Sequence, residues 1–105
     1  MAMVLTTNNF KNEVYEAEMP VLVDFYADWC GPCKAMGPVV EDLASEYASK
    51  VKVGKVNVDE NQELAMKYSV MSIPTFLVFK GEDVVARTMG MQDKAALVKA
   101  MESAL

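Results

Sequence analysis

Positions 21–34 of the chain read VLVDFYADWCGPCK, and the rest of the sequence is organised around this stretch. Val21–Ala27 is apolar on both strand faces except at Asp24, which indicates a central strand covered on both sides. Cys30 and Cys33 follow this strand and open a helical pattern that runs to Ser49, with its apolar residues on one face. The stretch therefore places two cysteines where a buried strand passes into an amphipathic helix.

Helical and strand patterns alternate along the remaining sequence. We predict a first helix over Asn8–Glu16, capped by Thr7, and a kink at Pro38 in the second helix. A strand over Val51–Asp59 and a short helix over Asn61–Tyr68 should follow. The chain should end with a hairpin of Thr75–Phe79 and Val84–Met89 and a last helix capped by Asp93. The order β-α-β-α-β-α-β-β-α predicts an α/β fold with a mixed sheet, parallel where helices connect the strands. At 105 residues, we expect residues 1–105 to form one domain.

Composition excludes several classes of function. With 10 basic and 15 acidic residues the net charge is −5, so nucleic acid and anionic membranes are poor partners. The absence of histidine excludes histidine bases and histidine-ligated metals. The N-terminus lacks the pattern of a signal peptide, and no apolar run approaches the length of a membrane span. We expect a cytoplasmic monomer.

The cysteine pair is open to several interpretations. Spacing of three residues in a first helical turn brings both sulfurs to one face, within reach of a disulfide, and the helix dipole favours a thiolate there. As a structural crosslink, so short a loop would contribute only about 2 kcal/mol. A metal site would need ligands that the chain lacks, unless two chains shared a metal or iron–sulfur centre. Reversible dithiol–disulfide exchange is the favoured interpretation.

Two charged residues stand out in the predicted strands. Asp24 is the only charge in its apolar run, so burial predicts a raised pKa, although a solvated patch would leave it ordinary. Lys55 shares strand parity with Val51 and Val53, which would turn its stem inward. An ordinary solvated lysine is the alternative.

The segment Val23–Lys34 strongly resembles the active-site segment of thioredoxins. The motifs VNVD at 56–59 and SIPTF at 72–76, and Gly90, follow in the order and spacing of that family, so the resemblance covers essentially the whole chain. It implies a five-stranded sheet in the order 1-3-2-4-5 flanked by four helices. It also implies a general protein-disulfide reductase that needs no cofactor beyond its own disulfide. Its partners would be disulfide-containing client proteins and a dedicated thioredoxin reductase, dependent on NADPH or on ferredoxin.

The resemblance also implies roles for individual residues. Cys30 would attack a client disulfide, and Cys33 would resolve the mixed disulfide. Asp24 would accept the proton of Cys33, with Lys55 near it.

The remaining implied site residues surround the dithiol. The Ile73–Pro74 bond would be cis and face the sulfurs, with Trp29, Gly31 and Pro32 in the active-site loop. Met71, Ile73, Pro74, Gly90 and Met91 would bind the substrate; for the two methionines, ordinary gap filling is an equal alternative. Met89 and Met91 flank Gly90 where smaller residues are common in the family, which bears on partner choice.

Other classes of function compete with a reductase. The same motif could serve an oxidase or isomerase, although the Gly31-Pro32 dipeptide and the expected cytosolic placement favour reduction. The chain could also act as a non-catalytic subunit that grips a larger enzyme through its apolar rim.

Overall fold

The computed structural model describes residues 1–105. Its elements follow the order β1 (Met3–Val4), η1 (Lys11–Tyr15), β2 (Val21–Tyr26), α1 (Gly31–Glu46), β3 (Lys52–Asn57), α2 (Gln62–Lys67), β4 (Thr75–Lys80), β5 (Asp83–Met89) and α3 (Lys94–Glu102). Every element predicted from the sequence is present, with ends that move by a few residues.

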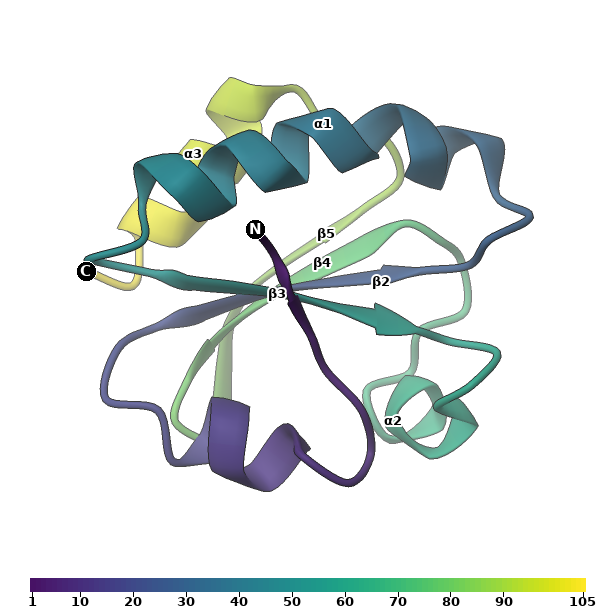
Figure 1. Cartoon of the computed structure of the whole chain (residues 1–105), viewed down its shortest axis with the longest axis horizontal. Helices are drawn as coiled ribbons and strands as arrows, with labels where there is room; N and C mark the ends of the chain where they lie inside the picture. Colours follow the sequence, from purple (N-terminus) through teal and green to yellow (C-terminus); the bar gives the residue numbers. More distant parts are fainter.

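One mixed sheet organises the fold, with its strands in the order β1-β3-β2-β4-β5 (Figure 1). β3 pairs in parallel with both β1 and β2, while β4 pairs antiparallel with β2 and β5. This is the strand order that the resemblance implies. Parallel pairing follows because α1 carries the chain back across the sheet between β2 and β3.

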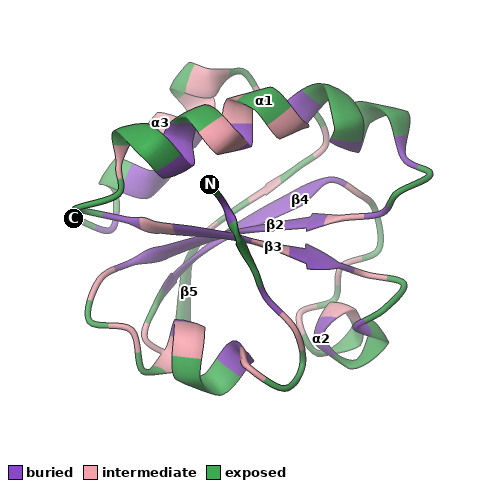
Figure 2. Cartoon of the chain, viewed as in Figure 1, coloured by how far each residue is buried: buried purple, intermediate pink, exposed green.

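The two faces of the sheet carry separate apolar clusters. Helices α1 and α3 lie on one face, and η1 and α2 lie on the other (Figure 1). Alternation along β2 sends Leu22 to the cluster beneath α1, whereas Val23 and Phe25 join the opposite cluster. By the same alternation Asp24 is on the α1 side. Burial extends along β2, β3 and β4 (Figure 2), so Asp24 lies in the most enclosed part of the sheet.

The N-terminal segment differs from the sequence prediction. The helical segment is a single π turn, and Thr7 does not cap it. Thr6 and Asn9 exchange hydrogen bonds instead, the Thr6 N–H to Asn9 Oδ1 at 2.7 Å and the Asn9 N–H to Thr6 Oγ1 at 3.2 Å. The Thr7 N–H donates to Asn61 Oδ1 at 2.9 Å, which ties it to the start of α2. A reciprocal bond one residue earlier therefore takes the place of the predicted cap.

The sequence also predicts a turn after β4, a cap on the last helix and a proline inside α1. Gly81 has φ +64° in the two-residue turn between β4 and β5, a conformation that glycine adopts at little cost. The Asp93 side chain caps α3 by accepting the Ala96 N–H at 2.9 Å, as predicted. α1 runs from Gly31 to Glu46 and continues through Pro38, where the kink stays a prediction.

Candidate active site

The cysteine pair lies where β2 passes into α1. Cys30 is the N-cap residue of α1, and a disulfide joins it to Cys33 with their Cα atoms 5.2 Å apart. The Cys33 backbone N–H points at Cys30 Sγ, at 3.1 Å. Pro32, in the first turn, has no N–H to leave unpaired. An N–H donor and the positive end of the helix dipole thus both face the Cys30 sulfur, where they stabilise negative charge.

Asp24 and Cys33 line the same cavity. Its volume is about 450 Å³, and Lys55 also contributes to its wall. β2 and β3 are paired so that Asp24 stands beside Lys55. Cys30 is not among the lining residues, so the two sulfurs have different surroundings. The cavity is polar and roomy enough to admit water between Cys33 and the carboxyl group.

Burial changes the acidity of Asp24. The residue is 5% exposed, and its Oδ1 has no hydrogen-bond partner in the protein. Desolvation raises the pKa of Asp24 from 3.8 to about 7, and the positive charge of Lys55 offsets part of that rise. Lys55 forms no ion pair with Asp24, and its Nζ lies over the Tyr26 ring, 5.7 Å from the centroid. The alternative of a solvated Asp24 is therefore wrong. Lys55 is half-buried, and its positive charge lowers the pKa of Asp24 without direct contact.

The loop before β4 approaches the cysteine pair at Cys30. The Ile73–Pro74 peptide bond is cis, as the resemblance implies. Ile73 O lies 3.9 Å from Cys30 Sγ. The Gly90 N–H donates to Pro74 O at 2.7 Å and so fixes the loop after β5 against the loop before β4. Ile73 thus lies beside Cys30, and Gly90 is linked to the same loop through Pro74.

Comparison with known proteins identifies this arrangement. The family model Thioredoxin matches residues 1–103. Thioredoxin 1 of Nostoc sp. is 46% identical over 101 residues, which cover 96% of this chain and 94% of that protein. Thioredoxin 1 of Synechococcus elongatus is 44% identical over 105 residues, covering 100% and 98%. Thioredoxin C-2 of Corynebacterium nephridii is 49% identical over 92 residues, covering 88% and 85%.

The chain belongs to the thioredoxin family. Together, the family and the Cys30–Cys33 pair identify it as a thiol–disulfide oxidoreductase that reduces protein disulfides. Thioredoxins carry their redox group as a disulfide of the protein itself, so the chemistry needs no cofactor. The family implies two kinds of partner, a reductase and disulfide-containing clients. None of the helices combines the length and the hydropathy that a membrane span requires.

The side chains around the dithiol of this thioredoxin are largely exposed. Trp29 is 71% exposed, Met71 92% and Met91 59%. Core packing is therefore excluded for Trp29, and gap filling does not explain the two methionines. Trp29 adjoins Cys30, Met71 comes two residues before Ile73, and Met91 follows Gly90. Such exposure suits a binding rim, because apolar side chains open to solvent gain most from contact with a partner.

Asp59 is a site residue that the sequence interpretation missed. Its Oδ2 accepts the indole N–H of Trp29 at 2.8 Å. Asn57 Oδ1 in turn accepts the Asp59 N–H at 2.9 Å, which holds the loop after β3 in place. Strand topology is the signal that could have found it, since the carboxyl ends of parallel strands β2 and β3 lie at one edge of the sheet.

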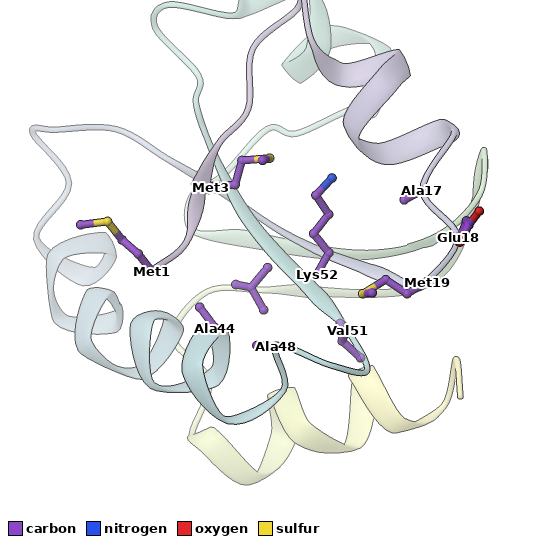
Figure 3. A pocket seen from close by; sticks show the side chains of 10 residues that line it. Met1, Met3, Ala17, Glu18, Met19, Ala44, Ala48, Val51 and Lys52 are labelled. Carbon is purple, nitrogen blue, oxygen red and sulfur yellow. The ribbon is translucent and has the colours of Figure 1, made fainter.

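Figure 3 shows the residues that line a second cavity, and neither cysteine is among them. Its volume is about 500 Å³, and Met1, Met3, Met19 and Lys52 are among its lining residues. Ala44 and Ala48 in its wall place it at the end of α1 remote from Cys33, about 20 Å along the helix. Lys52 is paired with Glu13, at 2.6 Å, and no cysteine lines the cavity. The thiol chemistry therefore belongs to the cavity that Cys33 lines.

Proposed function

We propose that Cys30 is the nucleophile and Cys33 the resolving cysteine of this protein-disulfide reductase. The observation that carries the assignment is the difference between the two sulfurs. Both cysteines are 5% exposed, but Cys30 Sγ accepts a backbone N–H and lies 3.9 Å from Ile73 O, whereas Cys33 lines the cavity that contains Asp24. A thiolate is therefore favoured at Cys30, and proton transfer at Cys33.

The proposed reaction transfers two electrons to the client. Cys30 thiolate attacks one sulfur of the client disulfide, and the other client sulfur leaves as a thiolate. Cys33 then gives up its proton to Asp24, attacks Cys30 Sγ and displaces the second client thiolate. The Cys30–Cys33 disulfide forms as the client disulfide is reduced.

Asp24 suits the role of proton acceptor because its pKa is about 7. Close to neutral pH such a carboxyl is present in both forms and can accept and return a proton. Lys55 would keep the pKa of Asp24 from rising further, since its positive charge favours the ionised carboxyl.

The proposed client-binding residues are Met71, Ile73, Pro74, Gly90 and Met91, with Trp29, Gly31 and Pro32 completing the active-site loop. Support comes from the exposure of Trp29 and the methionines and from the approach of Ile73 to Cys30. An extended client segment would lie along the Ile73–Pro74 loop beside its disulfide.

Trapping the mixed disulfide tests the assignment of the two cysteines. Cys33→Ser, incubated with insulin as a disulfide client, should accumulate a covalent adduct through Cys30 that a thiol reductant releases. Cys30→Ser is the matched control and should form little adduct. Non-reducing gels and peptide mass mapping give the readout, and an adduct chiefly at Cys33 would reverse the assignment.

Kinetics test the role of Asp24. Asp24→Asn should slow resolution of the mixed disulfide at pH 7, since general-base assistance typically contributes about 100-fold or more. Asp42→Asn, an exposed change on α1, is the control. If the rate of resolution and its pH dependence are the same in Asp24→Asn as in the wild type, Asp24 does not accept the proton.

We further propose that residues 1–105 act as a single-domain, cytoplasmic monomer re-reduced by a dedicated reductase. A reducing compartment suits the role because thiols are kept reduced there. Turnover coupled in parallel to an NADPH-dependent and a ferredoxin-dependent thioredoxin reductase identifies the donor, and light scattering gives the mass in solution. Failure of both reductases to support turnover would contradict the proposed donor.

A further inference from the structure

The nine methionines of the chain differ widely in exposure, and Met1 at the N-terminus and Met66 in α2 are 99% and 79% exposed. Met36 and Met101 are buried in the core at 2% and 0% exposure. Met71, Met89 and Met91 are 92%, 58% and 59% exposed, and we call these three the methionine rim. A thioether reacts with an oxidant in solution only if the oxidant reaches the sulfur. The rim sulfurs are therefore accessible to oxidants, whereas the two core sulfurs are shielded.

Met71 lies on the loop that faces the nucleophile. It comes two residues before Ile73, whose carbonyl oxygen is 3.9 Å from Cys30 Sγ. Its side chain is almost fully exposed and no intramolecular hydrogen bond involves it. Oxygen added to this sulfur would leave the fold in place and alter the surface beside Cys30.

Met89 is the last residue of β5, and Met91 lies just after that strand. They flank Gly90, whose N–H donates to Pro74 O at 2.7 Å. Met89 Sδ is 4.0 Å from Ser72 Oγ, so the side chain bridges toward the loop that carries Met71. The three rim methionines thus lie on the loop before β4 and at the end of β5, two segments that are joined to each other by these contacts.

We propose that the methionine rim is an oxidation site, at which hydrogen peroxide weakens the binding of protein clients. A lone pair of Sδ attacks one peroxide oxygen, the O–O bond breaks, and after proton transfer water leaves. The thioether is oxidised by two electrons to the sulfoxide, and peroxide is reduced to water. A sulfoxide is polar where the thioether was apolar, so the rim loses the contacts that it makes with an apolar client surface. This proposal rests on the proposed function, because the rim matters only if clients bind there.

The modification is separable from oxidation of the cysteines. A thiol reductant reverses the Cys30–Cys33 disulfide, whereas methionine sulfoxide persists until a dedicated reductase acts on it. Peroxide applied to the disulfide form meets no free thiol, since both cysteines of the chain are paired. Loss of activity that remains after re-reduction with dithiothreitol therefore reports on methionine.

The experiment compares treated and untreated protein, each re-reduced before assay. The disulfide form is exposed to hydrogen peroxide, quenched and reduced, and peptide mass mapping follows the sulfoxide at each methionine. We expect Met71, Met89 and Met91 to be oxidised well before Met36 and Met101. KM for insulin should rise roughly tenfold on treatment, as expected when apolar interface contacts become polar, while the rate with hydroxyethyl disulfide changes less than about twofold.

Two variants show whether the rim is responsible. In Met71→Leu/Met89→Leu/Met91→Leu the side chains stay apolar and of similar size but carry no sulfur to oxidise. The readout is the ratio of treated to untreated KM within each protein, so a change in the starting KM does not affect it. We expect this ratio to fall close to one in the triple variant. Met3→Leu, at the remote cavity, should show the same rise as the wild type.

Four other results of this experiment would count against the proposal or the proposed function. Equal rises in the triple variant and the wild type would overturn the proposal, as would complete rim oxidation without a rise in KM. A parallel loss with hydroxyethyl disulfide would place the damage at the dithiol and also overturn it. Failure of the untreated wild type to reduce insulin would instead contradict the proposed function.

Discussion

Replacing Asp24 with asparagine should stabilise the folded chain, and the gain should grow with pH. Burial raises the pKa of Asp24 from 3.8 to about 7 in the folded state. The folded chain thus holds this proton more tightly than the unfolded chain does. Well below pH 3.8 the carboxyl is protonated in both states and favours neither. As the pH rises toward 7 only the unfolded chain ionises, so the free energy of unfolding falls.

The size of the effect follows from the two pKa values. The difference between 3.8 and about 7 corresponds to about 4 kcal/mol lost at pH 8, and to about 2 kcal/mol at pH 5. Asparagine nearly matches the shape of aspartate and does not ionise in this range. The stability of Asp24→Asn relative to the wild type should therefore increase by about 2–3 kcal/mol between pH 5 and pH 8.

Urea unfolding of the disulfide form measures this difference. In that form the two cysteines do not titrate. Asp24 is then the buried active-site group whose titration changes stability. Linear extrapolation at several pH values gives the free energy of unfolding of each protein. Asp42→Asn, an exposed change on α1, should shift stability by no more than about 0.5 kcal/mol. A difference between Asp24→Asn and the wild type that stays constant from pH 5 to pH 8 would refute the reasoning.

Three further substitutions test separate parts of the structure. Lys55→Met should raise the pKa of Asp24 further, because the ammonium lowers it; an NMR titration of the carboxyl carbon that shows no upward change would contradict this. Gly54→Ala should destabilise the fold by about 1–3 kcal/mol, because an added Cβ would overlap the Leu5 side chain; urea unfolding checks it, and unchanged stability would mean that β1 yields freely. Arg87→Met should lower the free energy of unfolding by about 1 kcal/mol, because the guanidinium donates to two backbone carbonyls after α2, at 2.6 and 2.8 Å. Arg87→Lys keeps the charge and should recover only part of this loss, so full recovery would reject the role of the two-carbonyl contact.

Local patterns in the sequence predicted the parts of the site that depend on neighbouring residues. The apolar run around Asp24 predicted a buried strand, and the burial of that strand raises the pKa of the carboxyl. Cys30 and Cys33 are three residues apart at a helix start, so their pairing follows from helical geometry. The cis bond before Pro74 and the position of its loop came from the family resemblance and not from any local pattern.

Contacts that depend on tertiary structure could not be predicted from local patterns. The bond from Trp29 to Asp59 joins residues 30 positions apart, and it exists because β2 and β3 end at the same edge of the sheet. The cap at Thr7 was predicted wrongly because Thr6 and Asn9, equally good capping residues, bond each other one position earlier.

The equilibrium reduction potential of the Cys30–Cys33 pair shows most directly whether this dithiol reduces protein disulfides. Trp29 is the only tryptophan and adjoins Cys30, so its fluorescence should follow the redox state in defined thiol–disulfide buffers. A reductase requires a potential more negative than that of cytosolic glutathione, about −220 to −260 mV by biochemical extraction, and this is the result that we predict. A potential well above that range, toward the values of oxidases, would contradict the assignment as a reductase.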